Sequence, residues 1–144
     1  MRWERAVAII SIVLLGLSFA PAKDVVQRLG GVKSIYVASL GTEEGAELIR
    51  QKIAVWLINS KSITVVESAE DADAILTGMA QCSQVPGHGY SAVLVVRLNG
   101  KSNQLLWTDD VIPMRSGTRG ATSNIAENMV TDLLKAIAKD KKSK

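Results

Sequence analysis

The segment 90–98 constrains the fold more than any other part of the chain, because its apolar residues repeat every second position. Its two sides are Tyr90, Ala92, Leu94, Val96 and Leu98, and then Ser91, Val93, Val95 and Arg97. A period of two residues indicates a β-strand. Asn99-Gly100 follows directly, and this pair is typical of a hairpin turn. We therefore predict that 104–112 returns as an antiparallel strand, which Pro113 ends.

Three further strands are predicted at 34–40, 62–67 and 74–84. The first two are short segments rich in Ile, Val and Tyr, which favours extended backbone. The third contains Gly78, which is expected at a bulge or at a point of close backbone approach.

Two helices are predicted from apolar residues at helical spacing. The first lies between the strands at 34–40 and 62–67, where Thr42 offers a capping oxygen, and its apolar face is Ile49, Ile53, Trp56 and Leu57. The second begins after Asn124, which forms a capping box with Glu127. Its apolar face is Ile125, Met129, Leu133 and Ile137, widened by Val130 and Leu134. Trp107 is expected to pack beneath this second helix.

The predicted order is therefore β-α-β-β-β-β-α, an α/β (α+β) domain with a mixed sheet and both helices on one face. The first β-α-β unit is expected to be a right-handed parallel crossover. The later strands, joined by short turns, are expected to be antiparallel. One domain at 34–140 follows a lead-in segment at 23–33 and precedes a basic tail at 141–144.

The first 22 residues are predicted to be a secretory signal peptide. Arg2 and Arg5 form a positive region, 6–19 is apolar, and Ala20-Pro21-Ala22 is a small-x-small cleavage site. Cleavage after Ala22 predicts a periplasmic or secreted protein without a transmembrane segment. The alternative is a retained anchor, although the apolar run is shorter than the roughly 20 residues of a spanning helix. A lipid-modified mature N-terminus is excluded, because the one cysteine is Cys82.

Composition argues against several classes of function. The formal net charge of +3 falls to +2 when Arg2, Arg5 and Glu4 are removed, which predicts no nucleic-acid partner. One Cys and one His exclude a disulfide framework and Cys-based or His-rich metal sites. No G-x-S-x-G motif is present, and His88 lies between two glycines of a turn. We therefore expect no enzyme activity, no metal and no cofactor.

Acidic residues gather in the chain at Glu67, Glu70, Asp71 and Asp73. Their spacing does not match an EF-hand loop. A solvated turn, in which Asp71 or Asp73 caps backbone donors, is favoured over a Ca²⁺ site. Asp109 and Asp110 are expected on opposite faces of a strand, so they cannot act as one carboxylate pair.

Cys82 has two interpretations. An exported lone thiol can form an intermolecular disulfide. Cys82 shares strand parity with Leu76 and Ala80, however, and free cysteines are among the most buried residues. A core position is therefore favoured.

A partner-binding face is predicted on the side of the sheet away from the helices. If the helices cover the Leu94 side, Ile75, Val93, Val95 and Leu106 point away from them. Exposed contiguous apolar patches often mark partner sites. The alternatives are that the segment 23–33 covers this patch or that the sheet is curled.

A second candidate site is the loop 115–123, which carries Arg115 and Arg119 before the last helix. Guanidinium groups near a helix N-terminus can bind a phosphate or a carboxylate. The spacing does not fit a P-loop, and an ordinary loop is the alternative reading. This site supports a second hypothesis, that of a small-ligand or anion-binding periplasmic protein.

Two motifs carry a resemblance to known families. These are Ala72-Asp73-Ala74-Ile75-Leu76-Thr77-Gly78 and the segment from Gly100 to Trp107. With the order of elements over 34–138, they resemble the periplasmic α/β domains of the curli-secretion (CsgG-like) family and of the amino-terminal domain of TolB-like proteins. An outer-membrane lipoprotein that helps to assemble lipopolysaccharide has a similar order of elements.

The resemblance implies a cell-envelope accessory domain, which binds an envelope protein or self-associates, with a role in outer membrane assembly. The chain departs from the curli-type lipoproteins because it lacks a lipid-attachment cysteine and a long amphipathic hairpin. Pore formation is therefore not implied.

Overall fold

The computed structural model describes residues 27–116 and 120–143, with the backbone alone described at 111–116. The regular elements are β1 (Ser34–Val37), α1 (Ala46–Asn59), β2 (Thr64–Val66), β3 (Ala74–Val85), β4 (Gly89–Gly100), β5 (Leu105–Ser116) and α2 (Ala121–Lys142). Short 3-10 turns are η1 (Leu29–Gly31), η2 (Ala69–Asp71) and η3 (Lys101–Asn103). The predicted order of elements is confirmed.

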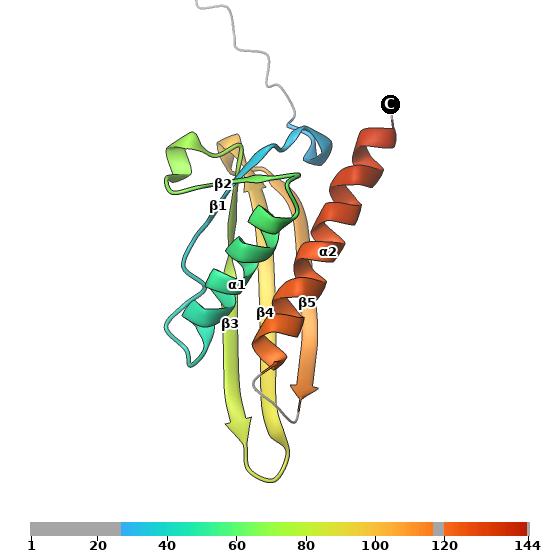
Figure 1. Cartoon of the computed structure of the whole chain (residues 1–144). Helices are drawn as coiled ribbons and strands as arrows, with labels where there is room; N and C mark the ends of the chain where they lie inside the picture. The colour runs from blue at the N-terminus through green and yellow to red at the C-terminus, as the bar shows by residue number, and fades with distance from the viewer. Residues whose placement is uncertain (1–26, 117–119, 144) are drawn as a thin grey trace, which may run out of the picture.

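The strands form one mixed sheet in the order β2-β1-β3-β4-β5, and α1 and α2 lie side by side on one face of it (Figure 1). β1 is parallel to β2 and to β3, while β3, β4 and β5 are antiparallel. The α/β class, the mixed sheet and the helices on one face are as the sequence predicts.

The expectation that all later strands are antiparallel is wrong for β2 and β3. They lie on opposite sides of β1 and both run parallel to it. The acidic turn carries the chain from β2 past β1 to β3. Asp73, at the end of this turn, is fixed to the start of β1, because its carboxylate accepts hydrogen bonds from the backbone N–H groups of Lys33 (2.9 Å) and Ser34 (3.1 Å). These donors, Lys33 first, hold the pKa of Asp73 below its ordinary value. Asp73 thus accepts from backbone donors, but these belong to the start of β1 and not to the acidic turn, which Ser68 caps by accepting from Glu70 N.

The core lies between the sheet and the two helices. On the sheet it contains Leu76, Ala80, Cys82, Ala92, Leu94, Val96 and Leu98. On the helices it contains Ile49, Ile53 and Leu57 from α1 and Ile125, Met129, Leu133 and Ile137 from α2. The alternation in β4 and both helical stripes therefore predicted the buried faces correctly, and Trp56 packs half-buried at their margin.

β5 extends past Pro113, which was expected to end it. The strand continues to Ser116, and Arg115 lies opposite Ser91. β5 is an edge strand, and its register with β4 shifts by one residue between Ala92 and Leu94. Proline is tolerated at sheet edges and bulges, where its missing N–H removes no ladder bond.

Both helices start at glycines and not at the predicted caps. α1 begins after Gly45, which has a φ of 78°, and α2 begins after Gly120, so Thr42 and the Asn124–Glu127 pair do not cap them. The segment before α1 is held along β3, since Leu40 O accepts from Ala80 N and Glu44 O accepts from Cys82 N. The helix therefore begins where this contact with β3 ends, after Glu44.

The lead-in segment is attached to the end of the domain over residues 27–33. The Gln27 side chain donates to Asp73 O and accepts from Lys101 N, at 2.7 Å each. Arg28 forms an ion pair with Asp140 of α2 at 3.1 Å, and Gly30 N donates to the same carboxylate. These residues therefore pack on the end of the sheet and on α2, and they do not cover the opposite sheet face.

Candidate functional site

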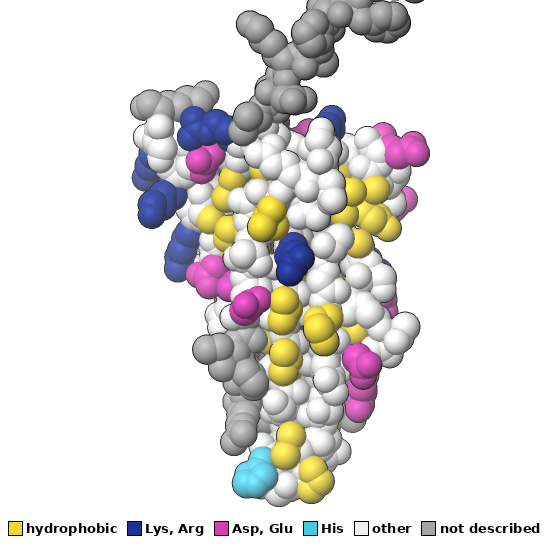
Figure 2. All heavy atoms as spheres, turned by 180° about the vertical axis from the view of Figure 1, so that it is seen from behind, with side chains coloured by type: hydrophobic (Ala, Val, Ile, Leu, Met, Phe, Trp, Pro, Cys, Tyr) yellow, Lys and Arg dark blue, Asp and Glu magenta, His cyan; other side chains and the backbone are white. Residues whose placement is uncertain are grey.

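The face of the sheet turned away from the helices is the candidate site, and we call it the outer sheet face (Figure 2). On the two central strands it consists of Ile75, Thr77, Met79 and Gln81 from β3 and Val93, Val95, Arg97 and Asn99 from β4. These side chains alternate with the buried residues of the same strands. Strand geometry therefore places them opposite the helices.

The middle of the outer sheet face is apolar. Met79 lies opposite Val95 in the β3–β4 ladder and is 52% exposed, while Ile75, Val93 and Val95 are half-buried. Three of the four residues predicted for partner binding, Ile75, Val93 and Val95, thus lie where the sequence places them.

The prediction for Leu106 is wrong, because this residue packs against the core cluster and does not lie on the outer sheet face. A register shift at the end of β4 is the reason, since Leu98 lies opposite Trp107 whereas Asn99 lies opposite Leu105. β5 has one extra residue at this shift, so the side chains of Leu105 and Leu106 do not point to the sides that simple alternation predicts. Leu105 is the exposed residue of the pair, at 56%, and Trp107 packs half-buried against the core.

Arg97 is the cation of the outer sheet face. It lies in β4 between Thr77 of β3 and Thr108 of β5. Its side chain is exposed, and among the described residues it has no ion pair with a carboxylate. The face therefore presents an apolar surface with one cation, Arg97, and one carboxylate, Asp110 of β5, and neither is in an ion pair among the described residues.

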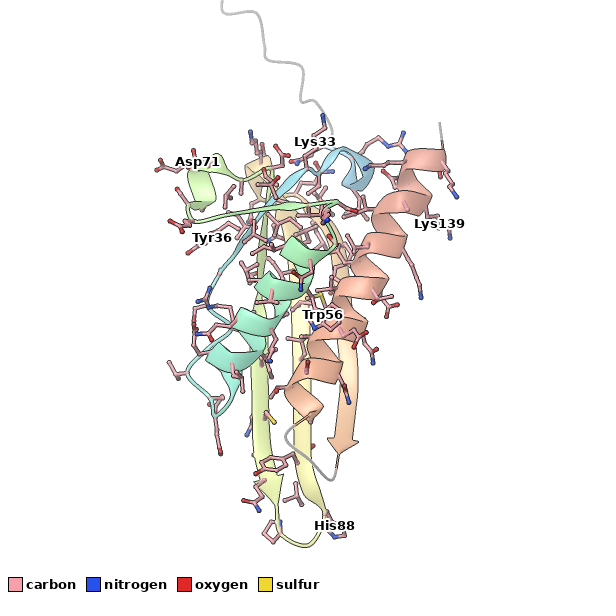
Figure 3. The ribbon with its side chains drawn as sticks, in the orientation of Figure 1. Lys33, Tyr36, Trp56, Asp71, His88 and Lys139 are labelled. Carbon is pink, nitrogen blue, oxygen red and sulfur yellow. The ribbon has the colours of Figure 1, made fainter. Side chains whose placement is uncertain are left out.

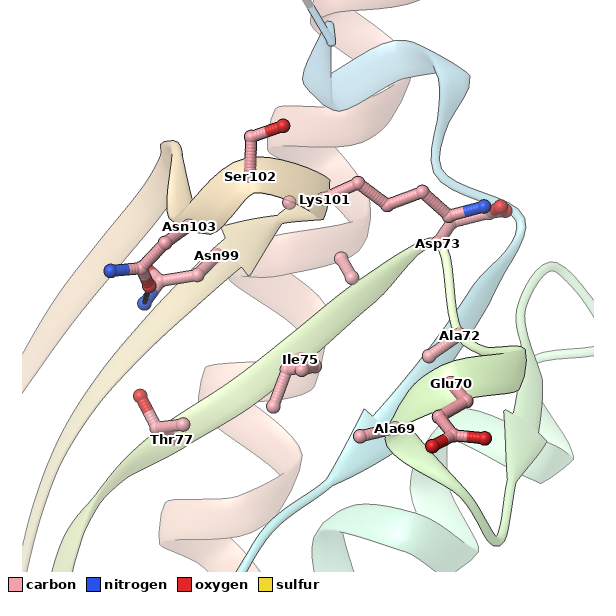
Figure 4. A pocket seen from close by; sticks show the side chains of 12 residues that line it. Ala69, Glu70, Ala72, Asp73, Ile75, Thr77, Asn99, Lys101, Ser102 and Asn103 are labelled. Atoms are coloured by element: carbon pink, nitrogen blue, oxygen red, sulfur yellow. Dashed lines mark hydrogen bonds between the residues drawn. The ribbon is translucent and has the colours of Figure 1, made fainter.

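A groove of about 550 Å³ extends the outer sheet face at one end (Figure 4). η2 and the start of β3 form one wall, and the β4–β5 turn forms the other. Asn99 donates to the Asn103 side-chain oxygen at 3.1 Å, and Lys101 lies near Asp73. Sequence reasoning missed this groove, because its walls are far apart in the chain and meet only through the β3–β4 pairing.

Cys82 is only 7% exposed, which confirms the predicted core position. Burial first, and then the charge of Glu44, raise the pKa of its thiol. Gly45 lies directly above it, because a Cβ atom there would be 2.7 Å from the Cys82 Cβ atom. The thiol is therefore poorly placed for reaction, since the thiolate is the reactive form.

The remaining predicted chemical groups lie apart from one another. His88 is exposed in the turn between β3 and β4, at the far tip of the hairpin in Figure 3. Glu67, Glu70 and Asp71 are exposed near the other end of the domain. Within the described ranges, no group of three or more His, Cys, Asp or Glu residues is arranged to hold a metal ion.

The predicted anion site falls largely outside the described residues. The backbone of Arg115 belongs to β5 and not to a loop, and α2 already includes 121–123. The side chain of Arg115 and the whole of Arg119 lie outside the described part of the structure. In the parts that are described, no helix is sufficiently long and apolar to cross a membrane.

Asp109 is a polar group that strand parity places toward the helices, opposite Val96. Its Oδ2 atom is buried and has no hydrogen-bond partner. Burial first, and then the carboxylates of Asp132 on α2 and of Asp110, raise its pKa. Asp110, opposite Val95, lies on the other face, as predicted.

Asp109→Asn is expected to raise the free energy of unfolding near pH 7 and to change it little near pH 3. A raised pKa means that the folded state binds more protons than the unfolded state between the ordinary and the raised pKa. Wild-type stability is therefore lost as the pH rises through the raised pKa, and the neutral amide avoids this loss. Urea unfolding at a series of pH values measures the difference. Asp110→Asn is the control, and parallel curves for wild type and Asp109→Asn would contradict the assignment.

Comparisons with known proteins show similarity in structure alone. No protein family model matches the chain, and no curated protein matches it. Among solved structures, it is similar to the PelC dodecamer from Paraburkholderia phytofirmans, with 17% identity and a TM-score of 0.50 over 73% of this chain and 88% of that one. A single-substitution variant of the same protein gives 15% identity and a TM-score of 0.49 over 73% and 86% of the two chains. At this identity the likeness establishes a common fold.

Proposed function

We propose that this chain is an exported, non-enzymatic domain of the cell envelope that assembles with further copies of itself. The outer sheet face is the surface through which it associates. The observation that carries the proposal is the apolar centre of this face, formed by Ile75, Met79, Val93 and Val95, over which no helix or strand of the described residues packs.

The apolar side chains of this face support the proposal that another molecule covers it. A two-layer domain normally presents polar side chains on the side of its sheet that faces water, which gives a regular apolar–polar alternation. In β4 both sides of the strand carry valines, since Val93 and Val95 alternate with Leu94 and Val96. This pattern is typical of a strand covered on both faces.

The choice of a second copy as the occupant has support from the fold comparison. The solved PelC structure with the same fold is a dodecamer, so this fold is compatible with assembly from identical subunits. The location is supported by the predicted signal peptide at 1–22 and by the resemblance to envelope-assembly families. Both agree with an accessory role at the envelope.

Sedimentation velocity of the purified exported protein tests the proposal. The wild-type chain is expected to sediment as an oligomer whose mass rises with concentration. Met79→Glu places a charge in the centre of the outer sheet face and is expected to weaken association by about tenfold or more. Thr131→Glu, on the exposed side of α2, is the matched control and is expected to behave as wild type. A wild-type protein that stays monomeric at every concentration would refute self-association.

The mass of the exported chain tests the proposed location independently of self-association. Mass spectrometry of the protein recovered from envelope extracts is expected to show a chain that begins at Lys23. A full-length mass found in the membrane fraction would show that 1–22 is an anchor.

A further inference from the structure

We infer that the contact between copies joins two different surfaces, so that the outer sheet face of one copy packs on the exposed side of α1 of the next. This inference rests on the proposed self-association and specifies its geometry. The second surface, which we call the α1 ridge, consists of Leu48, Val55 and Ile58.

The α1 ridge is unusual for a helix that already has a buried face. Leu48, Val55 and Ile58 are 46%, 50% and 57% exposed. They point away from the buried stripe of Ile49, Ile53 and Leu57. They lie among the exposed polar residues Glu47, Gln51 and Asn59, and exposed apolar side chains gathered on one side of a helix can mark a partner site.

α2 provides an internal comparison, because it belongs to the same layer and exposes no large apolar side chain among its described residues. Its exposed residues include Glu127, Asn128, Asp132, Lys135 and Lys139. Within the described part of the chain, the large apolar residues that are exposed lie on α1, at Met79 and at Leu105. Exposed apolar area is therefore a property of two particular surfaces and not of the whole molecule.

The two surfaces lie on opposite sides of the domain. The helices cover one face of the sheet (Figure 1), and the exposed α1 ridge is opposite the buried stripe of α1 that packs on that face, whereas the outer sheet face is seen from behind (Figure 2). One copy can therefore contact a neighbour on each side at the same time. A pairing of like surfaces would leave one apolar surface of every copy in water, while a pairing of unlike surfaces covers both.

Charge complementarity also favours the unlike pairing. Arg97 is exposed on the outer sheet face and has no ion pair among the described residues, not even with Asp110 of β5 on the same face. Glu43 and Glu44 are exposed beside the start of α1, and neither forms an ion pair within the described residues. Glu47 is already bound to Arg50 at 2.6 Å. The α1 side can thus supply the carboxylates that Arg97 lacks, which helps to fix the orientation of neighbouring copies.

Pairing through the sheet edges is a poor alternative. β2, at one edge, has three residues, Thr64–Val66. β5, at the other edge, contains Pro113 and a register shift. Short strands, proline and irregular edges disfavour the addition of another strand. Contacts between unlike faces repeat from copy to copy, and they close into a ring when the rotation between copies allows it.

A mixing experiment with two charged variants tests the inference. Met79→Glu disables the outer sheet face, and Val55→Glu disables the α1 ridge while replacing a β-branched residue by a better helix former. Each variant alone is expected to be monomeric by sedimentation velocity, and circular dichroism checks that both remain folded. An equimolar mixture is expected to form a heterodimer, because one intact sheet face can still contact one intact ridge.

The outcomes separate this inference from the proposed function. A monomeric wild type overturns both. An oligomeric wild type with an equally oligomeric Val55→Glu variant overturns the α1 ridge alone, and so does a mixture that stays monomeric. Thr131→Glu on α2 is the control in every mixture and is expected to associate as wild type does.

Discussion

Leu133→Ala is expected to lower the free energy of unfolding by about 2–5 kcal/mol. Leu133 lies on α2 and is fully buried between this helix and the sheet. Its removal leaves a cavity in addition to the lost burial of apolar surface. Because total stabilities of small domains are about 5–15 kcal/mol, this single change removes a large part of the stability. α2 is therefore an integral part of the core.

Urea unfolding of Leu133→Ala measures this effect. The measurement is made in the Met79→Glu background, so that association of the folded state does not add to the apparent stability. Thr131→Ala, two residues earlier on the exposed side of α2, is the control and is expected to change stability by less than about 0.5 kcal/mol. Equal midpoints for the two variants would show that α2 does not pack as described.

Gly78→Ala is expected to lower the free energy of unfolding by more than about 2 kcal/mol. Gly78 has a φ of 153°, and a Cβ atom there would overlap the carbonyl oxygen of Val95 on the neighbouring strand. The atom in the way is backbone, so it cannot move without separating β3 from β4. The sequence-based expectation of a close backbone approach at Gly78 is thus confirmed, while the continuous β3–β4 register shows no bulge there.

Two other glycines are controls that distinguish the cost of backbone strain from the cost of steric overlap. Gly87 has a φ of 74° and open space around it, so Gly87→Ala is expected to show the conformational cost alone, about 1–2 kcal/mol. Gly31 has neither a positive φ nor a neighbour within 4 Å, so Gly31→Ala is expected to be near neutral. If Gly78→Ala unfolds no more easily than Gly87→Ala, the close contact between the strands is wrong.

Much of the fold was predictable because its strongest patterns are local. The alternation in 90–98 and the stripes in both helices specify which side of each element is buried, and burial follows them. The order of strands in the sheet was less predictable at β3, which lies beside β1 and not beside β2. Its position involves the contact of Asp73 with Lys33 and Ser34, which are 40 and 39 residues away along the chain.

The candidate site was predicted in part for similar reasons. Parity within β3 and β4 placed Ile75, Val93 and Val95 on the outer sheet face, and it also holds for Met79. It failed at Leu106, because Leu106 is the extra residue of a bulge between Leu105 and Trp107, where simple alternation does not hold. The α1 ridge was not predicted, because only one apolar stripe was assigned to this helix. Leu48, Val55 and Ile58 were visible in the sequence as the second stripe.

The rate at which a thiol at position 79 is modified tests most directly whether another copy covers the outer sheet face. In Met79→Cys, the native Cys82 contributes little background, because it is 7% exposed and burial raises its pKa. The modification rate by a maleimide, measured after reduction of the protein and removal of the reductant, is expected to fall as protein concentration rises, whereas Thr131→Cys on α2 stays equally reactive. A thiol at position 79 that is modified as fast when the protein is oligomeric as when it is dilute and monomeric would show that the outer sheet face remains open, and would contradict the account.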